Sequence, residues 1–442
     1  MQFEQLVRSN VIAVGGRRVV VTGIGVVSSL GSTVEDFFTN LCDGRSGVGE
    51  LTRFDTSRCP IKRAAELTDF DPAEHGISER DIRVTARFQW LAIAASQAAA
   101  SDAGLDLPRN EVHSDTTRSP KKLDRFGVAI GVAYSNAEIL QRQYKLLEQG
   151  GSRSISARLC NLTLPNSPTS AVSIRHGLTG PLVTVSGASA SGAESLIAAY
   201  DKIKYGRAEL MLTGGAESAV NEITIAAFAQ NRTGSRIGVC RPFDDKRDGT
   251  ILGEGAGVVV LEELEHARAR GARIYGEVLG YGLRGDAYDM SDIRPDEAPG
   301  MRACLEEVLL DAGVSTAEVG YINVHGTGTK MNDPAEAFAI RKVFGSDPAT
   351  SPMVSGTKGA TGHMLGGTGG VEFITALLAS NRDVVPPTYG LENPDPRCAD
   401  LNHVIGKAIP ASVPTAITTS VGMGGNNSAI MVRGWSGGEE PV

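Results

Sequence analysis

The sequence has few cysteines, and no two of them form a Cys-x-x-Cys pair. Six are scattered along 442 residues, at Cys42, Cys59, Cys160, Cys240, Cys304 and Cys398. This distribution excludes a disulfide framework and the common zinc-binding patterns. We therefore expect reduced thiols that serve as small buried apolar side chains in a cytoplasmic protein, and we expect no metal site.

Long hydrophobic runs and an excess of positive charge are also missing. No apolar stretch approaches a membrane span, and residues 1–16 lack the apolar core and cleavage site of a signal peptide. Lys and Arg number 43 against 51 Asp and Glu, which gives a net charge of −8. Such a surface repels nucleic acid and anionic lipid overall, although it permits a local basic patch. The sequence therefore predicts a protein that binds neither nucleic acid nor a membrane.

Short β-rich runs alternate with helical segments along the chain. "RRVVVTGIGVV" is typical of a buried strand, and "TARFQWLAIAASQAAASDAG" has the apolar spacing of a helix. The alternation continues to "AITTSVGMGGNNSAIMVRG" and predicts an α/β protein with largely parallel sheets. We divide the chain into two parts, about 17–265 and 266–435, flanked by an extension at 1–16 and a tail at 436–442. The polar stretch 109–122 is expected to form a surface loop.

Four glycine-rich turns are candidates for a functional site. "TGIGVVSSLG" has a superficial Gly-x-Gly, but its third Gly is displaced and no acidic residue closes a following strand, so we interpret it as a structural turn. "VHGTGT" places His325 directly after a strand, and "GTKGATGHMLGGTGGVE" places Lys358 and His363 in a loop. "SVGMGGNN" is a glycine hinge at the end of a late strand.

A further turn, "TVSGASASGAES", runs from a strand end into a helix and places Ser189 at the tip of that helix. The position suits a nucleophile, although the Gly-x-Ser-x-Gly pattern of a nucleophile elbow is incomplete because residue 191 is Ser. Ser189, His325 and His363 together form a candidate catalytic constellation. We interpret the other histidines as surface or structural residues; they are His75, His113, His176, His266 and His403.

Five stretches carry a resemblance to a known family: "VVVTGIGVVSSLG", "RPFDDKRDGTILGEGAGVVVLEE", "NVHGTGTKMND", "GTKGATGHMLGGTGGVE" and "GMGGNN". From Arg17 to about Arg433 the chain resembles the β-ketoacyl-acyl carrier protein synthases, condensing enzymes with the thiolase fold. The likeness is closest to the elongating type of fatty acid synthesis and to type II polyketide systems. It implies two duplicated α/β halves in a five-layered αβαβα arrangement, usually assembled as a homodimer.

The resemblance also implies a catalytic set. Ser189 stands at the position of the nucleophile, at the N-terminus of a buried helix in the first half. His325 and His363 match the two histidines that the second half contributes, and Lys358 matches a structural lysine. The substrate is carried on the phosphopantetheine arm of acyl carrier protein, so the resemblance implies no cofactor of the enzyme's own.

Supporting residues follow from the same resemblance. Asp333 and Glu372 match buried carboxylates that help to order the site. Thr327 and Thr329 match residues that hold the phosphopantetheine arm. The backbone N–H groups of the nucleophile and of Met423 match the oxyanion hole.

The chain departs from the family pattern at the nucleophile and at the gate. The family turn has approximately the sequence Ala-Cys-small-Ser-Gly, and here Ser189 replaces the Cys. Met423 stands where a gating Phe is usual, and Val421 stands where a second Phe is common. The softer gate alters the control of acyl-chain entry. A Ser hydroxyl is a far poorer nucleophile than a thiolate unless a base contacts it, and its ester is less reactive than a thioester.

Serine at this position should impair acyl loading and condensation while sparing the decarboxylation of a malonyl thioester. Decarboxylation needs only donors to the carbonyl oxygen on which enolate charge develops. Within the family, stand-alone ketosynthase-like proteins with Ser at this place are associated with polyketide β-branching cassettes, where they convert malonyl-carrier protein to acetyl-carrier protein. We expect that reaction here. Arg232 aligns with a family Arg near the tunnel entrance and is a candidate contact for the acidic carrier protein.

Several alternatives stay open. In one, Ser189 accepts acyl groups, and the protein condenses, esterifies or cyclises a polyketide intermediate. In another, the chain is an active ketosynthase whose Cys has been changed to Ser. A third is a non-catalytic partner subunit resembling a chain-length factor, against which the presence of both His and Lys358 argues. A serine hydrolase ranks last, because no separate triad carboxylate is evident.

Overall fold

The computed structural model describes residues 16–112, 123–347 and 349–435. The predicted tail at 436–442 lies outside the described residues, as does the predicted extension at 1–16 apart from Gly16. Most of the polar stretch 109–122, with His113, lies outside them as well. Among the described helices, none combines the length and the apolar character that a membrane crossing requires.

A mixed sheet of eleven strands forms the frame of the described residues, in the order β12-β10-β9-β14-β15-β8-β1-β7-β6-β4-β5. The first five strands of this sheet along the sequence are β1 (Val19–Val27), β4 (Phe126–Gly131), β5 (Leu182–Val185), β6 (Leu210–Ser218) and β7 (Glu254–Glu263). The others are β8 (Gly276–Gly285), β9 (Val319–Asn323), β10 (Met353–Ser355), β12 (Asn402–His403), β14 (Thr415–Gly422) and β15 (Asn426–Gly434). β1 joins the two groups, because it pairs with β7 along its length and with β8 at Val19–Val21.

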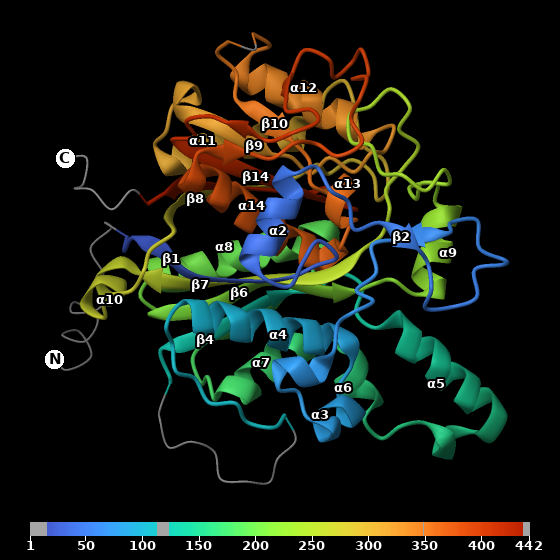
Figure 1. Ribbon diagram of the computed structural model, residues 1–442. Coiled ribbons are helices and arrows are strands. Elements are labelled where there is room, and N and C mark those ends of the chain that lie inside the picture. The colour runs from blue at the N-terminus through green and yellow to red at the C-terminus, as the bar shows by residue number, and fades with distance from the viewer. Residues whose placement is uncertain (1–15, 113–122, 348, 436–442) are drawn as a thin grey trace.

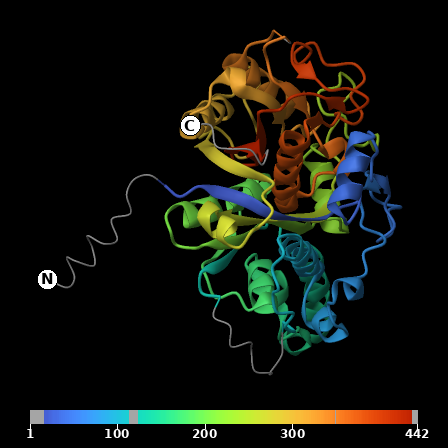
Figure 2. The ribbon, with the colours of Figure 1, turned by 60° about the vertical axis from the view of Figure 1, so that its left-hand side comes forward.

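Helices cover these two groups of strands in layers, as Figure 1 shows. On the outer face of the β7-β6-β4 group lie α4 (Arg87–Asp102) and α7 (Ser167–His176). Between the groups lie α8 (Ser191–Lys204) and α14 (Thr368–Arg382). On the far face of the β8-β15-β9 group lie α11 (Pro299–Ala312) and α12 (Asn332–Phe344). The expected five-layered αβαβα arrangement is confirmed, and Figure 2 shows the same order of layers from a second direction.

Further helices and strands complete the fold of the described residues. The helices among them are α2 (Val34–Cys42), α3 (Glu79–Val84), α5 (Ala137–Gly150), α6 (Leu159–Thr163), α9 (Glu222–Gln230), α10 (Leu264–Ala269) and α13 (Lys358–Thr361). Two small two-stranded antiparallel sheets pair β2 (Gly49–Glu50) with β3 (Arg63–Ala64) and β11 (Val384–Val385) with β13 (Ile409–Pro410). The predicted boundary at 265/266 falls within α10, and the division into two parts stays a prediction.

The expectation of largely parallel sheets was wrong. Five strand pairs are parallel, but the pairs β1-β7, β1-β8, β6-β7, β8-β15 and β14-β15 are antiparallel. A parallel pair needs a crossover connection, whereas a tight turn forces two strands to run in opposite directions. The glycine hinge after β14 is such a turn, because it returns the chain directly into β15.

The interpretation of "TGIGVVSSLG" as a structural turn was also wrong in its first part. Gly23 and Gly25 lie inside β1 and face α4. A Cβ atom at Gly23 would lie 2.2 Å from the carbonyl oxygen of Ala99, and one at Gly25 would lie 2.0 Å from that of Ala95. The two glycines therefore let an alanine-rich helix pack directly on the strand, which is a packing role and not a dinucleotide turn.

Candidate active site

Ser189 lies in a strained turn between β5 and α8. The turn is a 3₁₀ segment, η3 (Ala188–Ala190), and Ala188 adopts a φ of +52°, in the left-handed region that residues with a Cβ rarely occupy. Ser191 holds this turn: its Oγ donates to the carbonyl of Ala188 at 2.5 Å and accepts from the N–H of Gly187 at 3.0 Å. Ser189 is thereby presented, almost fully buried, at the N-terminal end of α8.

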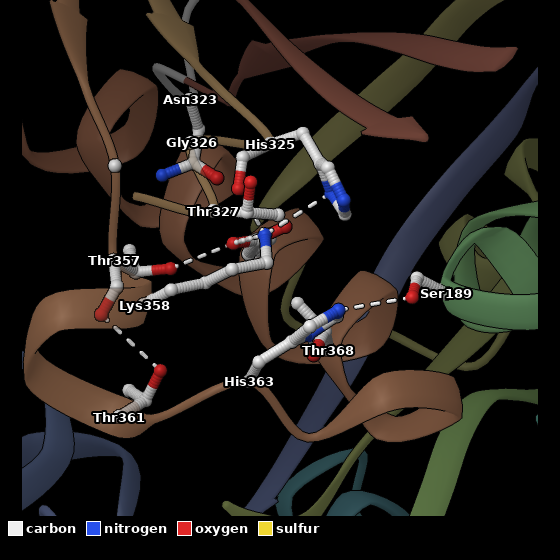
Figure 3. A network of polar contacts seen from close by, with 12 residues as sticks. Ser189, Asn323, His325, Gly326, Thr327, Thr357, Lys358, Thr361, His363 and Thr368 are labelled. Atoms are coloured by element: carbon white, nitrogen blue, oxygen red, sulfur yellow. Dashed lines mark hydrogen bonds and ion pairs between the residues drawn. The ribbon is translucent and has the colours of Figure 1, made fainter. Parts of the chain in front are cut away.

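His363 contacts Ser189 directly. Its Nε2 lies 2.9 Å from Ser189 Oγ, and its Nδ1 lies 3.1 Å from the hydroxyl of Thr368 (Figure 3). The backbone of His363 is fixed by a bridge to the segment before β7, since its N–H donates to the carbonyl of Ile251 at 2.6 Å. The structure thus brings together two residues that lie 174 positions apart in the sequence.

His325 lies beside His363 and is oriented by Lys358. The two imidazole rings are nearly perpendicular, at 83°, with centroids 5.5 Å apart. Lys358 Nζ lies 3.1 Å from His325 Nδ1, donates to the carbonyl of His325, and lies 2.7 Å from Glu372 Oε1. An ammonium group has no acceptor, so Nδ1 of His325 must accept this bond. The ring is therefore neutral, with its proton on Nε2.

The protonation states follow from burial. Burial, and secondly the charge of Lys358, hold the pKa of both His325 and His363 well below the usual value for histidine. Burial raises the pKa of Glu372 to about 7, although Lys358 opposes this effect. At neutral pH both imidazoles are therefore uncharged hydrogen-bonding groups.

The predicted pantetheine residues and Asp333 form a second polar cluster next to His325. The hydroxyls of Thr327 and Thr329 lie 3.0 Å apart, and Asp333 accepts from the N–H of Gly328 at 3.1 Å. Asp333 is fully buried, whereas the side chain of Thr329 is partly exposed. Asp333 therefore holds the buried side of a loop that carries two neighbouring hydroxyls, and Thr329 is the partly exposed member of the pair.

The two predicted gate residues occupy different environments. Met423, 46% exposed, lies in the turn between β14 and β15. That turn packs against the nucleophile turn, because a Cβ at Gly422 would lie 2.4 Å from the carbonyl of Gly187. Val421 is instead buried in the apolar core beside α12.

Arg232 is exposed and has a φ of +61°. Together with Arg236 and Asp248 it lines a shallow surface depression, away from the buried core. Asp248 is engaged by Ser235, whose hydroxyl donates to it at 2.6 Å. Two arginines and one aspartate line this depression, which leaves a net positive charge on its rim. Among the described residues, no group of three or more His, Cys, Asp or Glu is arranged to hold a metal ion.

Comparison with family models decides the relationship. Residues 16–267 match the model described as beta-ketoacyl synthase, N-terminal domain, and residues 275–392 match the C-terminal domain of the same family. The chain belongs to the beta-ketoacyl synthase family.

Curated relatives and solved structures agree with this membership of the synthase family. A 3-oxoacyl-[acyl-carrier-protein] synthase 2 from Coxiella burnetii is 41% identical over 422 residues, which is 94% of this chain and 98% of the relative. The protein of the same name from Synechocystis is 38% identical with the same coverage. The ishigamide ketosynthase/chain length factor matches with a TM-score of 0.87 at 32% identity, over 96% of this chain and 100% of that chain.

A second solved structure is a type II polyketide ketosynthase, bound to the hexaketide, in complex with its acyl-carrier protein (AntDE:AntF). It matches with a TM-score of 0.82 at 28% identity, over 95% of this chain and 100% of that chain. The synthase therefore has the thiolase fold that its sequence predicts.

Glu336 of this synthase belongs to the site, although it is not among the residues predicted from the sequence. Its carboxylate is fully buried and accepts from the N–H groups of His325 and Gly326, at 2.7 and 2.8 Å, and from the hydroxyl of Thr419 at 2.7 Å. The position one helical turn after Asp333 on α12 was the available signal, since both carboxylates face the same loop.

The segment 240–249 enters the sequence-based predictions only as part of the family resemblance, which does not indicate its structural role. In the structure it contacts the loop that contains Thr327 and Thr329. Arg247, fully buried, donates from Nε to the carbonyl of Thr329 at 2.9 Å and from Nη1 to Asp395 at 2.8 Å. The N–H of Phe243 donates to Asp333 at 2.8 Å. These hydrogen bonds hold the Thr327–Thr329 loop in place.

Replacing Lys358 by Met should destabilise the synthase by about 3–5 kcal/mol, because it leaves the buried Glu372 carboxylate without its partner. The free energy of unfolding in urea, measured at pH 8, checks this. Lys330→Met, at an exposed lysine, is the matched control and should change stability by less than about 0.5 kcal/mol.

Adding Glu372→Gln to Lys358→Met should recover part of the loss, since the second change removes the unpaired charge. If the losses in the free energy of unfolding simply add in the double variant, the two residues are not coupled.

Proposed function

We propose that this synthase acts on carrier-protein thioesters and that its main reaction is the decarboxylation of malonyl-acyl carrier protein to acetyl-acyl carrier protein. The observation that carries the proposal is the partner set of Ser189. A hydroxyl, not a thiol, contacts His363, and among the described residues the other nitrogen of His363 has the hydroxyl of Thr368 as its hydrogen-bond partner.

This arrangement activates Ser189 weakly. In hydrolases that use serine, a carboxylate behind the histidine orients it and stabilises the imidazolium that forms when it takes the serine proton. Here the neutral Thr368 occupies that place, and burial together with Lys358 opposes protonation of His363. Deprotonation of Ser189 during acyl transfer is therefore costly at this site.

Decarboxylation makes no such demand. The bond between the carboxylate carbon and the α-carbon breaks, CO₂ leaves, and its electron pair forms a thioester enolate. The enolate carbon then takes a proton from solvent to give the acetyl thioester. His325, with its proton on Nε2, supplies a donor to the enolate oxygen, and His363 supplies another when Thr368 donates to its Nδ1. The reaction needs no cofactor, because the thioester itself accepts the charge.

Other residues near the site are suited to bind the phosphopantetheine chain and the acyl carrier protein. We propose that the hydroxyls of Thr327 and Thr329 hold the phosphopantetheine chain, on the loop fixed by Asp333 and Arg247. The exposed Arg232 and Arg236 provide positive charge for an acidic carrier protein despite the net charge of −8. The N–H groups of Ser189 and Met423 are the proposed oxyanion hole, with Met423 at the gate. The expectation of a cytoplasmic protein stays part of the proposal.

A second candidate function is acyl transfer through Ser189. The 2.9 Å contact with His363 favours it, because a buried hydroxyl with an adjacent base is the minimum requirement for forming an acyl ester. In that case the protein would retain the condensing activity of the 3-oxoacyl synthases.

We also propose a homodimer. The edge strand β5 exposes Leu182 at 50%, and it packs on α7, which contacts α6 and, through it, α5. Leu164 after α6 and Leu140 on α5 are 48% and 51% exposed. An open strand edge flanked by exposed apolar side chains favours pairing with a second copy.

Incubation with malonyl-loaded carrier protein should yield acetyl-loaded carrier protein, seen as loss of CO₂ by intact mass spectrometry. His325→Ala or His363→Ala should lower the rate by about 100-fold or more, because each removes a donor to the enolate. Ser189→Ala should retain most of the rate.

Two results would contradict decarboxylation as the main reaction. One is loss of turnover in folded Ser189→Ala. The other is an acyl ester on Ser189 after incubation with a non-malonyl donor, which would favour the second candidate. No reaction with any carrier protein would favour a non-catalytic partner subunit.

Between pH 8 and pH 6 the decarboxylation rate at saturating substrate should show no titration of His325 or His363. Any step in that range should belong to Glu372, whose pKa burial raises to about 7, and should vanish in Glu372→Gln. The pKa values of His325 and His363 lie well below 6.5, so both rings remain neutral as the pH falls through that value. Measurement of kcat across this range checks it, with the unfolding temperature followed in parallel. A fall in kcat with a midpoint near 6.5 that persists in Glu372→Gln would show that an ordinary histidine controls the reaction.

Light scattering should give twice the chain mass of 46.3 kDa. Leu182→Lys should shift the protein toward the monomer, because it places a charge on the pairing edge. The exposed Leu310, on α11 at the opposite side of the fold, provides the control Leu310→Lys. A monomeric wild-type protein would rule out the dimer.

A further inference from the structure

Glu217, near the end of β6, is a fully buried carboxylate that the proposed chemistry does not use. One of its oxygens, Oε2, accepts from the N–H groups of Ala133 and Tyr134, at 2.8 and 2.9 Å. These residues follow β4, so the carboxylate ties the end of one strand to a segment beyond the end of its neighbour. The carboxylates of Glu254 and Glu262 are ion-paired with arginines, whereas Glu217 accepts from backbone amides.

The same oxygen of Glu217, Oε2, also faces the turn that follows His363, whereas Oε1 is buried with no hydrogen-bond partner among the described residues. This turn, η5 (Leu365–Gly367), begins at Leu365 with a φ of +45°, a strained value for a residue with a Cβ. A Cβ at Gly366 would lie 2.6 Å from the nitrogen of Ala133 and 3.1 Å from Glu217 Oε2. The N–H of Gly366 also favours the ionised carboxylate, whose pKa burial raises to about 7.

The same turn touches the helix that presents Ser189. A Cβ at Gly192, in the first turn of α8, would lie 2.6 Å from the carbonyl of Gly366. Gly366 therefore lies between Glu217 and the start of α8. A shift of this turn would move His363, three residues before Gly366, relative to Ser189.

We propose that Glu217 is a positioning residue: by holding the 365–367 turn against Ala133 and Tyr134, it sets the geometry of the contact between His363 and Ser189. The proposal does not depend on which reaction the site catalyses, because it concerns the contact and not the substrate. It adds a residue that lies outside the catalytic constellation.

The test uses a Ser189→Cys background, in which the reactivity of the thiol reports its contact with His363 and with the helix N-terminus. The pseudo-first-order rate of alkylation by iodoacetamide at pH 7 is measured per folded protein, with folding followed by unfolding temperature. Glu217→Gln in this background should lower the rate roughly tenfold, because a small displacement of a catalytic contact has a large effect on rate. Glu222→Gln, at an exposed glutamate at the start of α9, is the matched control and should leave the rate unchanged.

The direction in which the alkylation rate changes distinguishes a positioning role of Glu217 from a purely electrostatic one. Removing a nearby negative charge would by itself stabilise the thiolate, lower the thiol pKa and raise the rate. A slower rate with a raised thiol pKa supports the proposal, and an unchanged or faster rate in folded protein overturns it. If Glu217→Gln does not fold, Glu217→Asp provides the test, because its shorter side chain keeps the charge. A clearly slower alkylation rate in this variant supports the positioning role, and an unchanged rate overturns the proposal.

Discussion

The site depends on one buried ammonium group. Lys358 has three donors and the structure uses all of them, on the ring and carbonyl of His325 and on Glu372. Because an ammonium group accepts no hydrogen bond, this single contact fixes the tautomer of His325. Burial is the main reason why both imidazoles are neutral, and the positive charge of Lys358 adds to that effect. A buried charge of this kind is costly to desolvate, and the carboxylate of Glu372 offsets that cost.

Around this group the site is assembled from backbone turns that approach each other more closely than side chains would allow. Gly192, Gly215 and Gly366 come from three different elements, and each excludes a Cβ because another backbone occupies its space. Such contacts transmit the position of one turn directly to the next, with no flexible side chain between them. The strained φ angles of Ala188 and Leu365 lie at the two ends of this contact region, next to Ser189 and His363. Local strain at these positions is stabilised by the packed layers around them.

The layer order and the contact between Ser189 and His363 could be predicted from the sequence. Apolar periodicity and glycine-rich turns are local signals, and the family resemblance indicated which of these turns meet. The direction of the strands could not be predicted, since it depends on whether a connection crosses over the sheet or turns back. The carboxylates Glu336 and Glu217 were also missed. Each acts on backbone N–H groups of a segment far away in the sequence, and no local pattern distinguishes such a glutamate from a solvated one. Buried polar contacts of this kind become visible only when the fold has brought their partners together.

The turn that presents Ser189 does not use its hydroxyl to keep its shape. Ser191 makes the two hydrogen bonds that hold Gly187 and Ala188, and the side chain of residue 189 points away from them toward His363. The identity of the reactive atom is therefore separable from the architecture that presents it. Exchange of the Ser189 oxygen for a sulfur changes one atom within a turn that Ser191 already holds in shape. In evolutionary terms, a single substitution can exchange a hydroxyl for a thiol on the same backbone, without refolding of the chain or repacking of its core.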